Sequence, residues 1–162
     1  MIRRLILPQD RATVFTLMEA CADYVWLERE EPPLPYLVDE YFTDAPPGID
    51  PAEGHRPGLF DGDRLLALAE MSFGYPAPDA SYLGLMMVHP AARGTGAGLR
   101  LLRHLETVAR SRGVARLLLA ALEENPRGRA FWEREGFQPT GLAGDVTLGQ
   151  KTRKAHRFVK PL

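Results

Sequence analysis

A glycine-rich loop between an apolar run and an amphipathic segment constrains this chain more than any other feature. The apolar run covers 83–88, the loop covers 93–98, and apolar residues then recur at helical spacing over 97–112. This order predicts a strand, a loop and the start of a helix. Unpaired N–H groups at a helix start bind anions, and glycines let a ligand come close to the backbone. The segment therefore predicts a phosphate-binding loop.

The composition predicts one globular domain over residues 1–162. The chain is 45% hydrophobic, which is enough for a sizeable core at this length. Its single cysteine, Cys21, excludes an internal disulfide and a thiolate metal centre, and its histidines show no metal-ligand spacing, so we expect no metal. No apolar run reaches the roughly eighteen residues of a membrane span, and no signal peptide is evident. We therefore expect a cytoplasmic protein without a membrane partner.

The net charge of −1 conceals a separation of charge along the chain. Residues 1–82 hold 6 basic and 15 acidic side chains, whereas residues 83–162 hold 14 basic and 6 acidic ones. Two opposite fields in one domain predict two ligands of opposite sign, a polyanion for the basic half and a cationic amine for the acidic half. The alternative is that these charges only solvate the surface.

Hydrophobic periodicity and turn residues predict a mixed α/β order of elements. Asp10 is the expected N-cap of the first helix, and Asn125 followed by a proline is the expected start of the last one. The expected strands are 2–7, 59–60, 65–73, 82–88, 114–122, 137–141 and 155–160, and the expected helices are 10–27, 36–43, 97–112 and 126–135. The nearly continuous apolar run 114–122 is typical of a buried strand beside a parallel neighbour.

Other phosphate-binding loops fit the glycines less well. A dinucleotide-binding loop needs Gly-x-Gly-x-x-Gly, and the spacing of Gly94, Gly96 and Gly98 differs from it. A nucleoside-triphosphate loop ends in Gly-Lys-Ser or Gly-Lys-Thr, whereas this loop continues with Leu99 and Arg100. A plain strand–turn–helix connection without a ligand stays open on the loop alone.

A second motif decides between these alternatives. Asn125 is followed by Phe131-Trp132-Glu133 and then by Gly136-Phe137, while Arg93, Gly96 and Gly98 form Arg-x-x-Gly-x-Gly. Together, over about 83–137, these segments resemble the GNAT superfamily of acyl-CoA-dependent N-acyltransferases. The resemblance implies the GNAT fold, a mixed central sheet that splays at the cofactor cleft and carries flanking helices.

The resemblance also implies the chemistry. GNAT enzymes pass the acetyl group of acetyl-CoA to a primary amine, of a small molecule or of a peptide or protein, by direct attack without an acyl-enzyme. A backbone N–H of Val88 or Met87 would polarise the thioester carbonyl. The cofactor-binding residues implied are Met86, Met87, Val88, Arg93, Gly94, Thr95, Gly96, Ala97, Gly98, Asn125, Arg129 and Trp132.

The proton-transfer groups follow less directly. Trp132 stands where many relatives carry a tyrosine that protonates the leaving thiolate, and an indole is not a usable acid. Tyr75 and Tyr82 are substitutes to consider. Glu70 is our candidate general base, because it lies in an apolar strand where burial raises a carboxyl pKa. The alternative is that Glu70 faces solvent.

For the acceptor we expect a cationic amine near Tyr24, Trp26, Glu28 and Glu31, where carboxylates and aromatic faces attract an ammonium group. The missing tyrosine keeps open a non-catalytic acyl-CoA-binding or regulatory domain. The basic run 151–157 lacks an aromatic platform, so we expect no nucleic-acid partner. The sequence names neither the acceptor nor the oligomeric state, for which a homodimer is one candidate.

Overall fold

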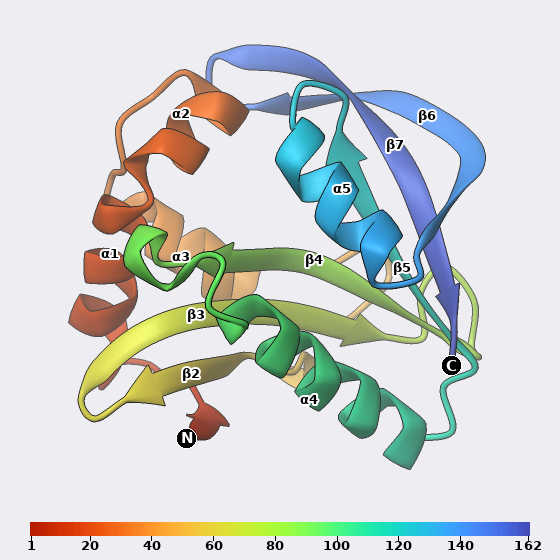
Figure 1. Ribbon diagram of the computed structural model, residues 1–162, viewed down its shortest axis with the longest axis horizontal. Helices are drawn as coiled ribbons and strands as arrows, with labels where there is room; N and C mark the ends of the chain where they lie inside the picture. Colours follow the sequence, from red (N-terminus) through yellow and green to blue (C-terminus); the bar gives the residue numbers. More distant parts are fainter.

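Seven strands form one mixed sheet in the order β1-β2-β3-β4-β5-β7-β6, and helices cover both of its faces (Figure 1). The computed structural model describes all residues, 1–162. Only β4 and β5 run parallel; all other neighbours are antiparallel. The elements are β1 Ile2–Arg4, α1 Arg11–Ala20, α2 Ala22–Arg29, α3 Tyr36–Thr43, the short 3₁₀ helix η1 Pro51–Glu53, β2 Pro57–Asp61, β3 Arg64–Phe73, β4 Ala80–Val88, the 3₁₀ helix η2 Pro90–Ala92, α4 Ala97–Ser111, β5 Arg116–Leu122, α5 Pro126–Arg134, β6 Gln138–Leu148 and β7 Lys151–Pro161.

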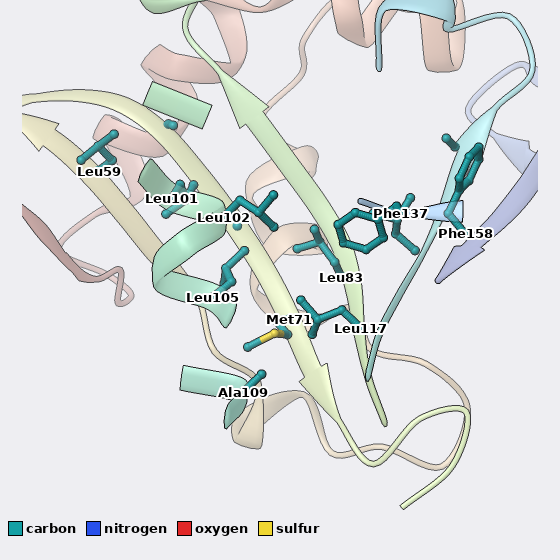
Figure 2. Close-up of a cluster of buried hydrophobic side chains, with 14 of the residues drawn as sticks. Leu59, Met71, Leu83, Leu101, Leu102, Leu105, Ala109, Leu117, Phe137 and Phe158 are labelled. Carbon is teal, nitrogen blue, oxygen red and sulfur yellow. The ribbon is translucent and has the colours of Figure 1, made fainter. Parts of the chain in front are cut away.

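Two apolar clusters, one on each face, hold the helices to the sheet. On one face, the apolar stripe of α4 packs against β2–β5, with Leu101, Leu102 and Leu105 fully buried (Figure 2). On the other face, α1 and α3 bury Val14, Leu17, Val38 and their neighbours against β2–β4. Both helix groups follow the predicted 3.6-residue spacing of apolar side chains. The mixed α/β sheet confirms the predicted fold class.

Most elements lie where they are predicted, but the first helix differs. It ends at Ala20 and resumes at Ala22, so Cys21 divides the predicted helix 10–27 into α1 and α2. Asp10 stands at the N-cap position without a capping hydrogen bond. Its carboxylate instead accepts hydrogen bonds from the Arg3 guanidinium at 2.8 and 3.0 Å and from the Ile6 N–H at 2.8 Å. The prediction of a capping side chain was wrong because a cation from β1 takes that carboxylate.

The two ends of the chain also depart from the predictions. The first strand ends at Arg4 instead of residue 7. The last two strands are each 11 residues long, because β6 and β7 form a hairpin that pairs almost to its turn at Gly149. The polar and glycine-rich composition of β6 hides this strand, since nearly all of its side chains are exposed. None of the helices is both long and apolar enough to cross a membrane.

A pair of histidines links α4 to the start of β2. The Nε2 atoms of His55 and His104 lie 2.9 Å apart, at hydrogen-bond distance. Such a bond needs one neutral ring as the acceptor, so the two rings cannot keep it when both are protonated. Burial and the neighbouring His104 lower the pKa of His55 to about 4, and burial lowers the pKa of His104 as well.

This pair predicts a loss of stability in mild acid. The pKa of each ring is lower in the folded chain than in the unfolded one, so the unfolded state binds more protons as pH falls from about 6.5 towards 4. The free energy of unfolding, measured in urea at several pH values, should fall over this window by up to about 1.4 kcal/mol per pH unit for each histidine. In His55→Gln/His104→Gln, whose amides do not titrate, the slope should be smaller. An unchanged slope would contradict the assignment.

Candidate active site

The sheet opens between its two parallel strands. Ala80–Leu83 of β4 pair with Arg116–Leu119 of β5, and pairing stops there. The same point carries a β-bulge, since Glu70 and Met71 of β3 face Leu85 and Leu83 of β4 and leave Gly84 without a partner. A bulge bends its strand and turns it away from a neighbour. A cavity of about 1120 Å³ fills the opening, walled by β4, β5, α2, α3 and α5.

Backbone groups of β4 face this cavity. The His89 N–H donates to the Leu66 carbonyl of β3 at 2.7 Å. Because hydrogen bonding alternates along an antiparallel pair, the N–H of Met87 also points to β3, whereas those of Met86 and Val88 point to the opening. Of the two N–H groups predicted to polarise a thioester, the ladder thus turns that of Val88 to the cavity. The N–H groups of Met86 and Val88 thus form a strand edge that is available to a ligand.

The glycine-rich loop leads directly from this strand end into α4. Gly96 is the N-cap of α4 with φ +90°, a conformation that suits glycine. No hydrogen bond within the protein uses the N–H groups of Gly96, Ala97, Gly98 and Leu99. Four free donors at the positive end of a 15-residue helix make a site for a phosphate group. These donors, with open space in front of Gly96, fit the chemistry of a pyrophosphate.

The Arg93 side chain holds the loop in place. Its Nε donates to the Val88 carbonyl at 3.1 Å, and its two terminal nitrogens bind the Asp23 carboxylate at 2.6 and 3.1 Å. The buried Cys21 thiol, whose pKa burial raises to about 11, donates to the same carbonyl at 3.4 Å. Arg93 therefore positions the loop and the end of β4, and its charge is already paired with α2.

The second motif lies on the opposite wall. The Asn125 side chain accepts a hydrogen bond from the Gly128 N–H at 3.0 Å and so caps α5, as its spacing predicts. Trp132 lines the cavity and packs edge-on against Phe131 and Phe137, with ring centroids 4.9 and 5.4 Å apart. Arg127, at the start of α5, also lines the cavity. Sequence reasoning missed Arg127, although an arginine in the first turn of a predicted helix beside a phosphate loop is a usable signal.

The acidic half of the chain forms the other end of the cavity. Tyr24 and Glu28 of α2 line it, and burial raises the pKa of Glu28 to about 7 against the opposing effect of Arg29. Arg29 is itself bound to Glu40 of α3 at 2.7 Å, which leaves Glu28 without a cation of its own. Glu40 and Arg29 line the cavity too, and the sequence analysis did not single them out.

Glu70 lies at the bulge where the sheet begins to open. Its side chain is 6% exposed, lines the cavity and accepts a hydrogen bond from the Ser72 hydroxyl at 2.7 Å. Burial raises the pKa of Glu70, and the Ser72 hydrogen bond opposes this effect. Gly84 provides the space, because a side chain there would strike the Glu70 carboxylate. The alternative that Glu70 faces solvent was wrong, because Glu70 lies on the same face of β3 as Leu68, and the helices α1 and α3 cover this face.

Two tyrosines stand near the point of opening. Tyr75 and Tyr82 line the cavity with their rings edge-to-face, 5.5 Å apart. Burial raises the pKa of Tyr82, so its hydroxyl keeps its proton at neutral pH.

The structure brings most of the predicted site residues together around one cavity. Those that line it are Tyr24, Glu28, Glu70, Met86, Met87, Val88, Arg93, Gly94, Gly96, Gly98, Asn125 and Trp132. Trp26, Glu31, Thr95, Ala97 and Arg129 lie outside its lining. Trp26 is 57% exposed, and Glu31 instead bonds Tyr36 and Gln150. Thr95 turns its hydroxyl back to the Ala92 carbonyl.

Comparison with known proteins shows the family of this chain. Residues 16–137 match the model of the acetyltransferase (GNAT) family, which is most of the chain. The chain belongs to the GNAT acetyltransferase family. This membership confirms the resemblance carried by the two motifs, and it makes the chain an acetyltransferase by family.

Individual relatives are more distant. The chain is 38% identical over 82 residues to a mycothiol acetyltransferase of Beutenbergia cavernae, a match that covers 51% of this chain and 27% of the relative. The matched part thus spans about a quarter of that curated relative. An acetyltransferase from Thermus thermophilus has the same fold, with a TM-score of 0.77 and 22% identity over 100% of this chain and 97% of that one. The PaiA N-acetyltransferase of Thermoplasma acidophilum, solved in complex with coenzyme A, has a TM-score of 0.73 to this chain. It is 14% identical to it, and the match covers 100% of this chain and 98% of that one.

The loop assignment predicts that a side chain at Gly96 abolishes acetyl-CoA binding. In Gly96→Val the isopropyl group would occupy the space before the free N–H groups and strain a backbone at φ +90°. Calorimetric titration with acetyl-CoA should detect no binding. Gly113→Val is the matched control, because Gly113 has φ +73° and open space at the other end of α4. The control should bind normally, and equal binding by both variants would contradict the assignment.

Proposed function

We propose that this protein transfers the acetyl group of acetyl-CoA to the primary amine of a cationic acceptor by direct attack. The observation that carries the proposal is the opening between β4 and β5. There, one cavity joins free strand N–H groups, the loop donors of α4 and a buried carboxyl group. The family is one of acetyltransferases, so the alternative of a non-catalytic acyl-CoA-binding domain is not favoured.

In this proposal, the cofactor occupies the half of the cavity at the loop and α5. The free N–H groups from Gly96 to Leu99 bind the pyrophosphate, and Arg127 adds a positive charge. A pantetheine amide pairs with the Met86 N–H at this strand edge, as an added strand would, and the Val88 N–H is left for the thioester. Arg129, placed outside the cavity lining, stays a predicted cofactor contact without support from the cavity.

The Val88 N–H then faces the thioester oxygen. A donor aimed at the oxygen that gains charge in the transition state is typically worth about 3–4 kcal/mol. The amine nitrogen attacks the thioester carbon, its bond to carbon forms as the carbon–sulfur bond breaks, and CoA leaves as a thiolate. Holding both reactants in one water-poor cavity supplies much of the remaining rate.

For this reaction to balance, the acceptor nitrogen must lose two protons and the sulfur must gain one. The acceptor arrives as an ammonium ion and loses the first proton before attack, and we assign its removal to the Glu70 carboxylate, which returns it to solvent. The departing thiolate gains a proton from the Tyr75 or Tyr82 hydroxyl, and the second proton, which the nitrogen loses once its bond to carbon has formed, restores that hydroxyl. Trp132 does not donate this proton; its indole packs against Phe131 and Phe137 in the wall of the cavity.

The charges of the cavity support a cationic acceptor. Glu28, Glu40 and Glu70 face its acceptor end, and only Glu40 has a bound cation. An unpaired, half-buried carboxylate is costly on its own and gains from an ammonium partner. We propose Tyr24 and Glu28 as acceptor-binding residues, whereas Trp26 and Glu31 lie outside this end of the cavity. We also propose that the enzyme acts in the cytoplasm, with acetyl-CoA and a free amine as its partners.

Glu70→Gln should lower kcat/KM at neutral pH by at least about a hundredfold, because a general base commonly contributes this much. Acetyl-CoA binding should be unchanged. A second variant separates chemistry from folding: in Ser72→Ala the lost hydrogen bond to Glu70 raises the pKa of that carboxyl group. The acidic limb of kcat/KM should therefore shift to higher pH. An unshifted limb in Ser72→Ala would remove Glu70 as the base.

Glu28→Gln should raise KM for the best amine by about tenfold, the loss of one charged contact. Since the Glu28 carboxyl is ionised only above its pKa of about 7, the wild-type KM should fall as pH rises through that value. The variant should lack this dependence. Glu19→Gln, which removes an exposed carboxylate of α1 in the same acidic half, is the control and should behave as wild type. An unchanged KM in Glu28→Gln would place the acceptor elsewhere.

A further inference from the structure

A contact between α2 and the β6–β7 turn crosses one side of the acceptor end of the cavity. We call it the strap; it consists of Arg29, Glu30 and Glu31 on one side and Gly149, Gln150 and Lys151 on the other. The Gln150 N–H donates to the Arg29 carbonyl at 3.1 Å. Lys151 Nζ binds the Glu30 carboxylate at 2.8 Å, and Gln150 Nε2 donates to Glu31 at 3.1 Å. In Figure 1 the β6–β7 turn reaches across to the end of α2.

The strap is closely fitted. Gly149 has φ +55°, and a Cβ atom there would lie 2.9 Å from the Arg29 Cβ and 3.0 Å from the Arg29 carbonyl oxygen. Only a glycine allows the two backbones to approach this far. Glu31 continues the contact to α3, where it accepts a hydrogen bond from the Tyr36 hydroxyl at 2.7 Å. The turn, α2 and α3 are thus tied into one rim.

The inner side of this rim is the cavity wall. Val146 and Leu148 of β6 line the cavity on the hairpin side, and Glu28 and Arg29 line it on the helix side. A peptide acceptor would have to break the strap. If a lysine reacts, the peptide backbone continues on both sides of that residue, and if the N-terminal amine reacts, the backbone continues beyond it, so in both cases the backbone would lie across this rim. A free amine of a few carbons needs no such opening.

We infer that the acceptor is a small free amine enclosed whole behind the strap, and not an amino group carried by a peptide or protein. This inference rests on the proposed acetyl transfer. The strap is also able to open for exchange of small ligands, since the Glu30 and Lys151 side chains are 44% and 31% exposed and exposed ion pairs are weak. Its closure then limits the size of the acceptor, and the Glu28 carboxylate selects a positive charge within it.

The test is a release assay for the CoA thiol with two matched sets of acceptors. One set holds small mono- and diamines; the other holds short peptides with a free N-terminus or a lysine. For the wild type, we expect the best small amine to exceed the best peptide in kcat/KM by about a hundredfold, the range in which site contacts discriminate between substrates. A peptide that matches or exceeds the small amines would overturn the inference and leave acetyl transfer intact. Calorimetric binding of acetyl-CoA without transfer to any amine would instead contradict the proposed function, and the inference with it.

Strap variants show whether the contact itself sets this preference. Lys151→Glu places two carboxylates opposite each other and should lower the ratio of small-amine to peptide kcat/KM by at least about tenfold. The charge exchange Glu30→Lys/Lys151→Glu should restore the ratio. Gly149→Val should lower this ratio too, whereas Gly141→Val, at a position of β6 with φ +87° and open space, should not. Thermal melting checks that each variant is folded, and ratios unaffected by Lys151→Glu and Gly149→Val would overturn the role of the strap.

Discussion

The loss of pairing between β4 and β5 is the constraint on which the rest of this structure depends. Two strands that run parallel side by side as far as Leu83 and Leu119 then separate, and each leaves backbone groups facing the gap. Backbone N–H and C=O groups need partners, so a sheet opened in this way is incomplete without a ligand. The bulge at Gly84 both bends β4 and admits the buried Glu70 carboxyl at the point of separation. One local irregularity therefore creates the strand edge, the cavity and the site of a candidate base.

The separation of charge along the sequence becomes a separation in space. The loop and α5 bring the basic half to one end of the cavity, while α2, α3 and β3 bring the acidic half to the other. Several of these charges also serve the fold, as the pairs Arg93–Asp23 and Arg29–Glu40 show. Glu28 is different, because burial holds its pKa near 7 and no cation is bound to it. Burying the Glu28 carboxyl group without a bound cation lowers the stability of the fold. We attribute its presence to the acceptor that it is proposed to bind.

Much of the fold could be predicted from the sequence because its signals are local. The loop at Gly96, the Asn125 cap and the apolar run of β5 each lie within a few residues, and the structure has the corresponding elements. The site could be predicted only in part, because side-chain directions depend on contacts distant in the chain. Arg3 takes the Asp10 carboxylate, and Gln150 takes Glu31 out of the acceptor set. Two features leave no periodic signal in the sequence. One is the bulge at Gly84 that makes room for the Glu70 carboxyl, and the other is the strap, formed by residues more than a hundred positions apart.

The central claim is that the open edge of β4 receives the pantetheine of acetyl-CoA. Amide hydrogen exchange resolved at single residues, with and without acetyl-CoA, tests this most directly. The N–H of Met87 bonds to β3 and should be protected in both states, whereas those of Met86 and Val88 face the opening and should become protected when acetyl-CoA binds. Saturating acetyl-CoA that leaves the exchange of Met86 and Val88 unchanged would contradict the account.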